Sequence, residues 1–198
     1  VHSGDASGVV PSSFRILRKI LSRLEDENTG EIKPKELHAE IPAQRVEQAK
    51  LSAAVLGDDV YSKFPLLEGM QPISKDLAEL VLNRTWRPAL SITGIGGLPA
   101  LDSAGNVLRP FTAVKVSLRL PPSANAAKSG EFLKQLLEAD PPYGSTVTFN
   151  LEKAGSGWDA PPLAAWLEQA VDEASRTYFG PPPAYMGEGG SIPFMGML

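Results

Sequence analysis

The stretch TAVKVSLRL, residues 112–120, decides the fold of this chain. Apolar residues occupy every second position from Val114 to Leu120, and Lys, Ser and Arg fill the positions between them. Because successive side chains of a strand point to opposite faces, this alternation predicts a β-strand with one buried face. Pro121 and Pro122 end the strand, since proline has no N–H to extend the ladder. A sheet covered on one face is therefore expected to organise the chain.

The segments around this strand predict the rest of the unit. Residues 89–95 and 147–151 are expected to be strands, and the second of these alternates apolar residues with Thr and Asn. Residues 12–25 and 125–139 carry apolar residues at helical spacing and are expected to be helices. With one further strand before Val1, the order becomes βαββαβ. This order predicts an α+β fold, a two-layer, ferredoxin-like antiparallel sheet with helices on one face.

Two further segments add to this unit. Residues 42–83 carry apolar residues in two helical pieces and predict a helical insert. A C-terminal helix is expected to start at Pro161-Pro162, where a missing N–H is harmless, and to carry an apolar stripe that includes Trp166. Because the composition changes after Gly155, we expect two structural regions, 1–155 and 156–198.

The composition excludes several classes of protein. Apolar residues make up 42% of the 198 residues, enough to build a core and to exclude general disorder. The 19 basic and 23 acidic residues are well mixed, without the basic stripe that nucleic-acid binding requires. No apolar run approaches the roughly 20 residues of a membrane span. The chain contains no cysteine, which excludes disulfides and thiolate chemistry and fits a reducing, cytoplasmic location.

Four short motifs occur in a fixed order along the chain. They are His2-Ser3-Gly4 followed by Gly8 and Pro11, then Asn106-Val107-Leu108, Ser117-Leu118-Arg119-Leu120-Pro121 and Glu188-Gly189-Gly190-Ser191-Ile192-Pro193. Together they resemble the lid, or dimerisation, domain of the dinuclear-zinc peptidase family. That family includes carnosinase-type dipeptidases, glutamate carboxypeptidase, acetylornithine deacetylase and aminoacylase. The resemblance implies a lid and dimerisation domain over residues 1–155 and, over 156–198, a segment that returns to the catalytic domain.

The resemblance also implies roles for individual residues. His2 would reach the active site of the partner subunit in a homodimer and stabilise the oxyanion there, and Asn106 would contact the substrate across the same dimer. Arg119 would pair with the terminal carboxylate of the substrate. The pocket would also be lined from the catalytic side by Glu188, Gly189, Gly190 and Ser191.

The sequence departs from the family pattern at three positions. The family often has Arg directly before the signature Glu, and Gly187 stands there in this chain. Ser7 replaces the first glycine of the opening Gly-Gly, and the proline near Asn106 comes one place late, at Pro110. These departures leave the substrate contacts near Glu188 and the register between Asn106 and Arg119 open.

The resemblance implies a parent enzyme with two zinc ions, whose ligands and general-base Glu lie outside this chain. The chain has two histidines, His2 and His38, and neither begins the His-x-Asp that such a site uses. We do not expect His38-Ala39-Glu40 to bind metal, and we expect this chain alone to be catalytically inactive.

Several functions remain open from the sequence. The long helical insert favours the carnosinase-type branch, and hence a zinc-dependent peptidase acting on dipeptides or other small peptides. The alternatives are the lid of an amide deacylase of the same family, with acyl-amino-acid substrates, and a non-enzymatic dimerisation or binding module that shares only the topology. In that last case His2 is a frayed terminus, Asn106 is a turn residue and Arg119 is a solvated or salt-bridged side chain.

Overall fold

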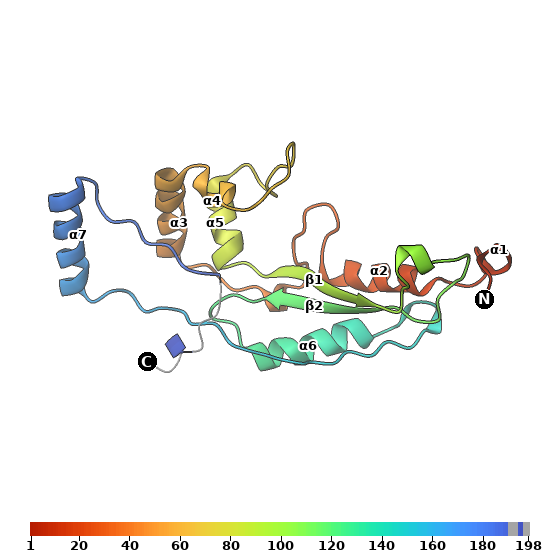
Figure 1. Cartoon of the computed structure of the whole chain (residues 1–198). Coiled ribbons are helices and arrows are strands. Elements are labelled where there is room, and N and C mark those ends of the chain that lie inside the picture. Colours follow the sequence, from red (N-terminus) through yellow and green to blue (C-terminus); the bar gives the residue numbers. More distant parts are fainter. Residues whose placement is uncertain (190–193, 196–198) are drawn as a thin grey trace. The chain divides into compact units, whose positions relative to one another are not determined.

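The computed structural model of this chain describes residues 1–189 and 194–195 (Figure 1). The chain divides into two compact units. The first comprises Val1–His38, Pro88–Leu120 and Ala124–Gly155, and the second comprises Ala39–Arg87, Pro121–Ser123 and Ser156–Leu198. Gly155 is the last residue of the first unit, but the helical insert groups with the C-terminal segment in the second unit, so the division into 1–155 and 156–198 stays a prediction. The assignment of 156–198 to a catalytic domain stays a prediction.

The first unit contains the antiparallel pair of strands that the sequence predicts. Strand β1, Ala89–Gly96, pairs with β2, Ala113–Arg119, so that Ala89 lies opposite Arg119 and Gly96 lies opposite Ala113. A bulge between Ile92 and Gly94 shifts the register once. Along β2 half-buried and exposed residues alternate strictly, which confirms the single buried face.

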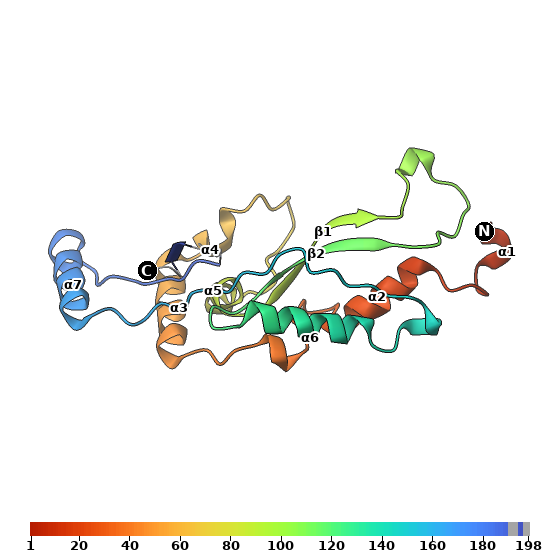
Figure 2. The same cartoon turned by 90° about the horizontal axis from the view of Figure 1, so that it is seen from below.

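Helices α2, Ser13–Leu24, and α6, Ala126–Glu138, lie on one face of this sheet (Figure 2). Their apolar stripes meet the buried face of the strands in one core. It consists of Leu24, Ile32, Leu37 and Leu133, with Leu90, Leu118, Leu120, Phe132, Leu136 and Phe149 packed around them. The α+β arrangement of a sheet with helices on one face is thereby confirmed.

The third expected strand, 147–151, does not form. Val147 and Phe149 are half-buried and Thr148 and Asn150 are exposed, so the alternation is present, but these residues join no ladder. The amide of Phe149 donates instead to the Glu138 carboxylate at 2.7 Å. A strand needs a neighbouring strand to bond to, and within the described residues the sheet has two strands only.

The C-terminal end of α6 is capped by a side chain from α2. The Arg23 guanidinium donates to the carbonyl oxygens of Leu136 at 3.2 Å and Asp140 at 2.6 Å, and also to that of Ala139. The last carbonyls of a helix have no partner within the helix. A cation at this end also interacts favourably with the negative end of the helix dipole. Arg23 thus ties the two helices together across the core.

Replacing Arg23 with glutamine is expected to lower the free energy of unfolding by about 1–2 kcal/mol, because three carbonyls lose a charged donor. Urea unfolding followed by circular dichroism measures this change. Arg18→Gln is the matched control, since Arg18 is an exposed cation on the same helix whose side chain has no partner among the described residues. Equal effects of the two substitutions would show that Arg23 acts only as a surface charge.

The second unit is helical. Its helices are α3, Ala43–Leu56, α4, Asp59–Ser62, α5, Leu77–Thr85, and α7, Ala165–Phe179. The Asp76 carboxylate caps α5 by accepting the amides of Ala78 and Glu79. The core of this unit consists of Ala49, Ala53, Val60, Val81, Leu82 and Trp86.

The C-terminal helix differs from its prediction in two respects. It begins at Ala165 rather than at Pro161-Pro162, and it contains no buried residue. The apolar stripe is present in the sequence, but Trp166 is 72% exposed. The apolar face of helix α7 is therefore at most half-buried in the described part of the chain.

Within the part of the chain that the structure describes, no helix combines the length and the apolar character needed to cross a membrane.

Candidate functional site

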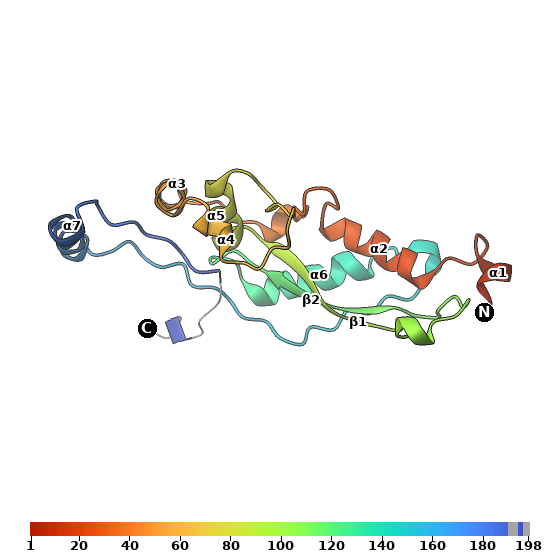
Figure 3. The same ribbon diagram turned by 45° about the horizontal axis from the view of Figure 1, so that its top comes forward.

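The structure joins two of the expected site residues, His2 and Asn106, at one end of the hairpin. His2 forms an antiparallel bridge with Val107. The Ser3 amide donates to the Asn106 carbonyl and the Leu108 amide donates to the Val1 carbonyl, each at 2.9 Å. Both the chain start and the β1–β2 connection lie where β2 begins (Figures 1 and 3). Two of the four sequence motifs, far apart in the chain, thus form one backbone unit.

The imidazole of His2 is held in a defined orientation. His2 is the N-cap of the short helix α1, Ser3–Ala6, and its Nδ1 accepts the Gly4 amide at 3.0 Å. A Cβ at Gly4 would lie 3.0 Å from that same Nδ1, so the glycine of His-Ser-Gly leaves room for the ring. A neutral imidazole carries one proton, so accepting at Nδ1 places that proton on Nε2.

As a consequence of this cap, the Nε2–H group of His2 is a hydrogen-bond donor held in one orientation. His2 is exposed, and no hydrogen bond to its Nε2 forms within the described residues. The ring therefore presents an N–H outward while its other nitrogen is fixed by the backbone. Sequence reasoning missed α1 and this cap, although Gly4 was the available signal for a close approach.

Arg119 lies at the other end of the hairpin, where β2 ends. It is exposed and, among the described residues, makes no ion pair. Lys115, on the same face of β2, does pair with Glu152 at 2.5 Å. The salt-bridge alternative for Arg119 is thus absent from the described part of the chain, and its guanidinium is available to another anion.

The length of β2 separates Arg119 from His2. An antiparallel strand rises about 3.4 Å per residue, so β2 alone puts roughly 20 Å between its ends. The backbone that carries His2 and Asn106 lies at the start of β2 and Arg119 lies at its finish. The structure therefore does not bring all three side chains together, and one dipeptide-sized molecule does not reach from His2 to Arg119.

The described part of the last motif is held within the second unit. The Glu188 carboxylate forms an ion pair with Arg84 at 2.8 Å, and Gly189 packs directly on the carbonyl of Arg84. Gly190 and Ser191, the other two expected pocket residues, lie outside the described residues. No signal in the sequence singled out Arg84 as the partner of Glu188.

The described residues of this chain include no group that could form a metal centre. Within residues 1–189 and 194–195 no group of three or more His, Cys, Asp or Glu side chains could hold a metal ion. His38 is half-buried, and its Nε2 lies 2.5 Å from the Ile32 carbonyl oxygen, to which a protonated ring nitrogen donates. This contact gives His38 a structural role in the first unit.

Comparison with known families identifies the fold. The M20 family of peptidase dimerisation domains matches residues 1–144. The chain belongs to this family. A dimerisation domain, by its description, implies a second copy of itself as partner.

One known relative of this chain is a much longer protein. The Cys-Gly metallodipeptidase DUG1 of Saccharomyces cerevisiae is 28% identical over 201 residues, which cover 98% of this chain and 40% of that protein. The chain thus spans less than half the length of this relative. This relative is a metallodipeptidase by name.

Solved structures agree with the M20 dimerisation fold. The DUG1 structure from S. cerevisiae superimposes with a TM-score of 0.67 at 22% identity and covers 98% of this chain and 40% of its own. Human carnosine dipeptidase 1 gives 0.65 at 20% identity over 100% and 42% of the two chains. The M20 metallo-carboxypeptidase Sso-CP2 from Sulfolobus solfataricus gives 0.62 at 18% identity over 98% and 49%. At these identities the likeness concerns the fold alone.

Proposed function

We propose that this chain is the lid and dimerisation part of a longer zinc-dependent peptidase that hydrolyses dipeptides or other small peptides. The parent holds two zinc ions through residues outside this chain, and the chain alone is inactive. The observation that carries the proposal is the fixed imidazole of exposed His2, whose Nδ1 accepts the Gly4 amide and whose neighbour Ser3 is bonded to the Asn106 backbone. Membership of the M20 family, with relatives that are metallodipeptidases by name, supports the reaction class.

His2 serves as the donor to the carbonyl oxygen of the bond that is cleaved. That oxygen gains negative charge when water attacks, so a donor placed in advance stabilises the transition state more than the ground state. The cap at Nδ1 keeps the proton on Nε2 and holds the ring in one orientation. Asn106 adds a polar contact to the substrate from the same backbone unit.

Arg119 binds the terminal carboxylate of the substrate. Its planar guanidinium matches a carboxylate with two parallel hydrogen bonds, and no carboxylate of the described chain competes for it. Because roughly 20 Å of strand separates the two ends of β2, His2 and Arg119 of one subunit act in different active sites. His2 therefore serves the site of the partner subunit, and Arg119 serves the site of its own.

The relatives and the insert support the proposed substrate class. The helical insert forms α3, α4 and α5. Relatives that match nearly the whole chain, and therefore the insert, include dipeptidases by name. An amide deacylase acting on acyl-amino acids is the second candidate, since the same donor suits any amide carbonyl. Neither nucleic acid nor a membrane is a partner in this proposal, and the cysteine-free chain suits a cytoplasmic location.

The parent polypeptide tests this proposal. Dipeptide hydrolysis is expected to disappear after dialysis against a chelator and to return when zinc is added, while the 198-residue chain alone shows no turnover. Initial rates on a panel of dipeptides and N-acyl amino acids distinguish the two enzyme candidates. A parent that hydrolyses neither class in the presence of zinc would leave the non-enzymatic module as the remaining function.

A further inference from the structure

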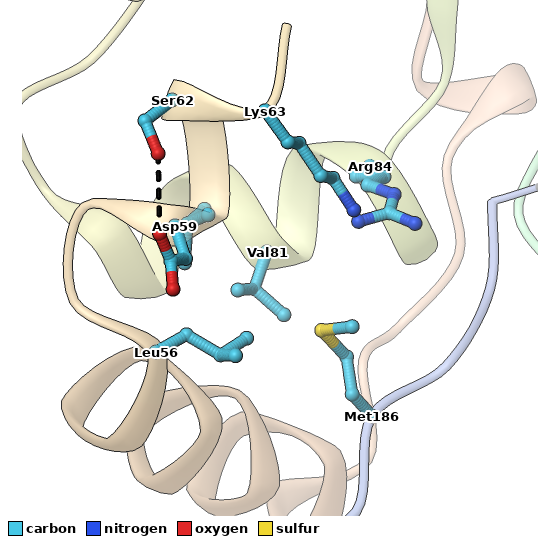
Figure 4. Close-up of a pocket in the computed structure, with 8 residues that line it drawn as sticks. Leu56, Asp59, Ser62, Lys63, Val81, Arg84 and Met186 are labelled. Atoms are coloured by element: carbon cyan, nitrogen blue, oxygen red, sulfur yellow. Dashed lines mark hydrogen bonds between the residues drawn. The ribbon is translucent and has the colours of Figure 1, made fainter.

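The segment 185–189, which leads into the Glu-Gly-Gly-Ser signature, is fixed on the helical insert. The Ser52 hydroxyl of α3 donates to the Tyr185 carbonyl at 2.9 Å, and Ser52 is buried. Met186 lines a cavity of about 310 Å³ together with Leu56 of α3, Val60 of α4 and Val81 of α5 (Figure 4). The segment is therefore bonded to α3, and its Met186 faces a cavity that all three helices of the insert line, before the chain reaches Glu188.

Arg84, in the last turn of α5, holds the signature glutamate. Its Nη2 lies 2.8 Å from one carboxylate oxygen of Glu188 and 3.1 Å from the other. The Arg84 side chain is 27% exposed and the Glu188 side chain is 64% exposed. An exposed glutamate without a partner samples several rotamers, whereas a guanidinium that contacts both oxygens restricts them.

The backbone of Arg84 contacts the same segment. A Cβ at Gly189 would lie 2.2 Å from the Arg84 carbonyl oxygen, so only glycine allows this approach. A Cβ at Gly187 would lie 3.5 Å from Thr85 Cγ2, which is ordinary contact. The side chain of Arg84 thus fixes Glu188 while its carbonyl fixes Gly189, the next residue.

We propose that Arg84 is a positioning residue for the substrate pocket, and that the helical insert is the platform on which Glu188 and Gly189, the described start of the signature, are placed. Arg84, on α5, places a guanidinium beside the signature glutamate. The inference rests on the proposed function and on the expectation from the sequence that Glu188 and Gly189 line the substrate pocket. It predicts that Arg84 acts on substrate binding through Glu188, without contacting the reacting atoms.

The first test measures the segment itself, in the 198-residue chain. Nuclear magnetic relaxation of the Gly187 and Gly189 amides gives their order parameters. In Arg84→Gln these are expected to fall from about 0.85 to below about 0.6. Arg87→Gln is the matched control, because Arg87 follows the same helix but pairs with Glu79 at 2.5 Å and Asn83 at 2.8 Å. The charge-reversed pair Arg84→Glu with Glu188→Arg is expected to restore the order.

The second test measures the parent enzyme. Arg84→Gln is expected to raise KM about 3- to 10-fold with kcat changed less than about 2-fold, since an exposed ion pair that orients a binding residue affects binding. Arg87→Gln is expected to leave both constants unchanged, and the charge-reversed pair is expected to recover KM.

Each outcome decides the inference. Order parameters that do not change in Arg84→Gln overturn it, whatever the activity. Lower order parameters with an unchanged KM in an active parent also overturn it, because Arg84 would then have a structural role only. If the unsubstituted parent hydrolyses no peptide, the proposed function fails, and the relaxation measurement still decides whether Arg84 positions the segment.

Discussion

Replacing His2 with alanine in the parent peptidase is expected to lower kcat about 100- to 1,000-fold while the dimer persists, because the transition state loses one oriented hydrogen-bond donor. KM is expected to change little, since the donor acts mainly on the charge that develops during attack. Steady-state kinetics on a dipeptide measures the effect, and sedimentation confirms the dimer. His2→Gln retains an acceptor for the Gly4 amide and an N–H donor, so it is expected to recover part of the loss.

Mixed dimers test whether His2 acts across the interface. When His2→Ala subunits are combined with Arg119→Ala subunits, one active site of each mixed dimer receives both defects and the other receives none. The mixture is therefore expected to regain up to about half of the activity per mixed dimer, although each variant alone is nearly inactive. This expectation follows from the roughly 20 Å of β2 that separates its two ends.

The same mixture of variants can also contradict the proposal that His2 acts in the partner subunit. If His2 and Arg119 served one site, every site of a mixed dimer would carry one defect, and mixing would restore nothing. Unchanged turnover in His2→Ala, with the dimer intact, would reduce His2 to the cap of α1.

The local spacing of apolar residues correctly predicted those strands and helices that have a packing partner within this chain. The alternation over 112–120 became β2 because β1 is available to pair with it and because α2 and α6 cover its apolar face. The same kind of alternation over 147–151 produced no strand, since the Phe149 amide bonds to Glu138 instead. The apolar stripe of α7 likewise contains no fully buried residue. The spacing of apolar residues predicts which face a segment would bury, but burial also requires a second apolar surface to cover that face.

The candidate site shows a similar limit. The motifs named His2, Asn106, Arg119 and Glu188, and the structure joins the first two through one pair of backbone hydrogen bonds. The antiparallel bridge between His2 and Val107 is a tertiary contact, which no spacing in the sequence reveals. The ion pair of Arg84 with Glu188 is likewise non-local. Residue types can be predicted from motifs, but the partners that orient them depend on the fold.

The largest effect on stability is expected from Leu82→Ala in the core of the second unit. Leu82 is 4% exposed and packs with Val81 and Trp86. Truncation removes buried apolar atoms and leaves a cavity, so the free energy of unfolding is expected to fall by about 2–5 kcal/mol. Leu67→Ala removes the same atoms from a side chain that is 75% exposed and is expected to change stability by less than about 0.5 kcal/mol.

Tryptophan fluorescence during urea unfolding measures the difference in stability between the two variants in the core of the second unit. The three tryptophans, Trp86, Trp158 and Trp166, all belong to the second unit, and Trp86 is the buried one. The red shift of its emission therefore reports unfolding of the core that contains Leu82. A lower midpoint in Leu82→Ala with an unchanged slope means lost stability of a packed core. Equal midpoints for Leu82→Ala and Leu67→Ala would mean that the insert helices do not pack around Trp86, and the platform for segment 185–189 would lose its physical basis.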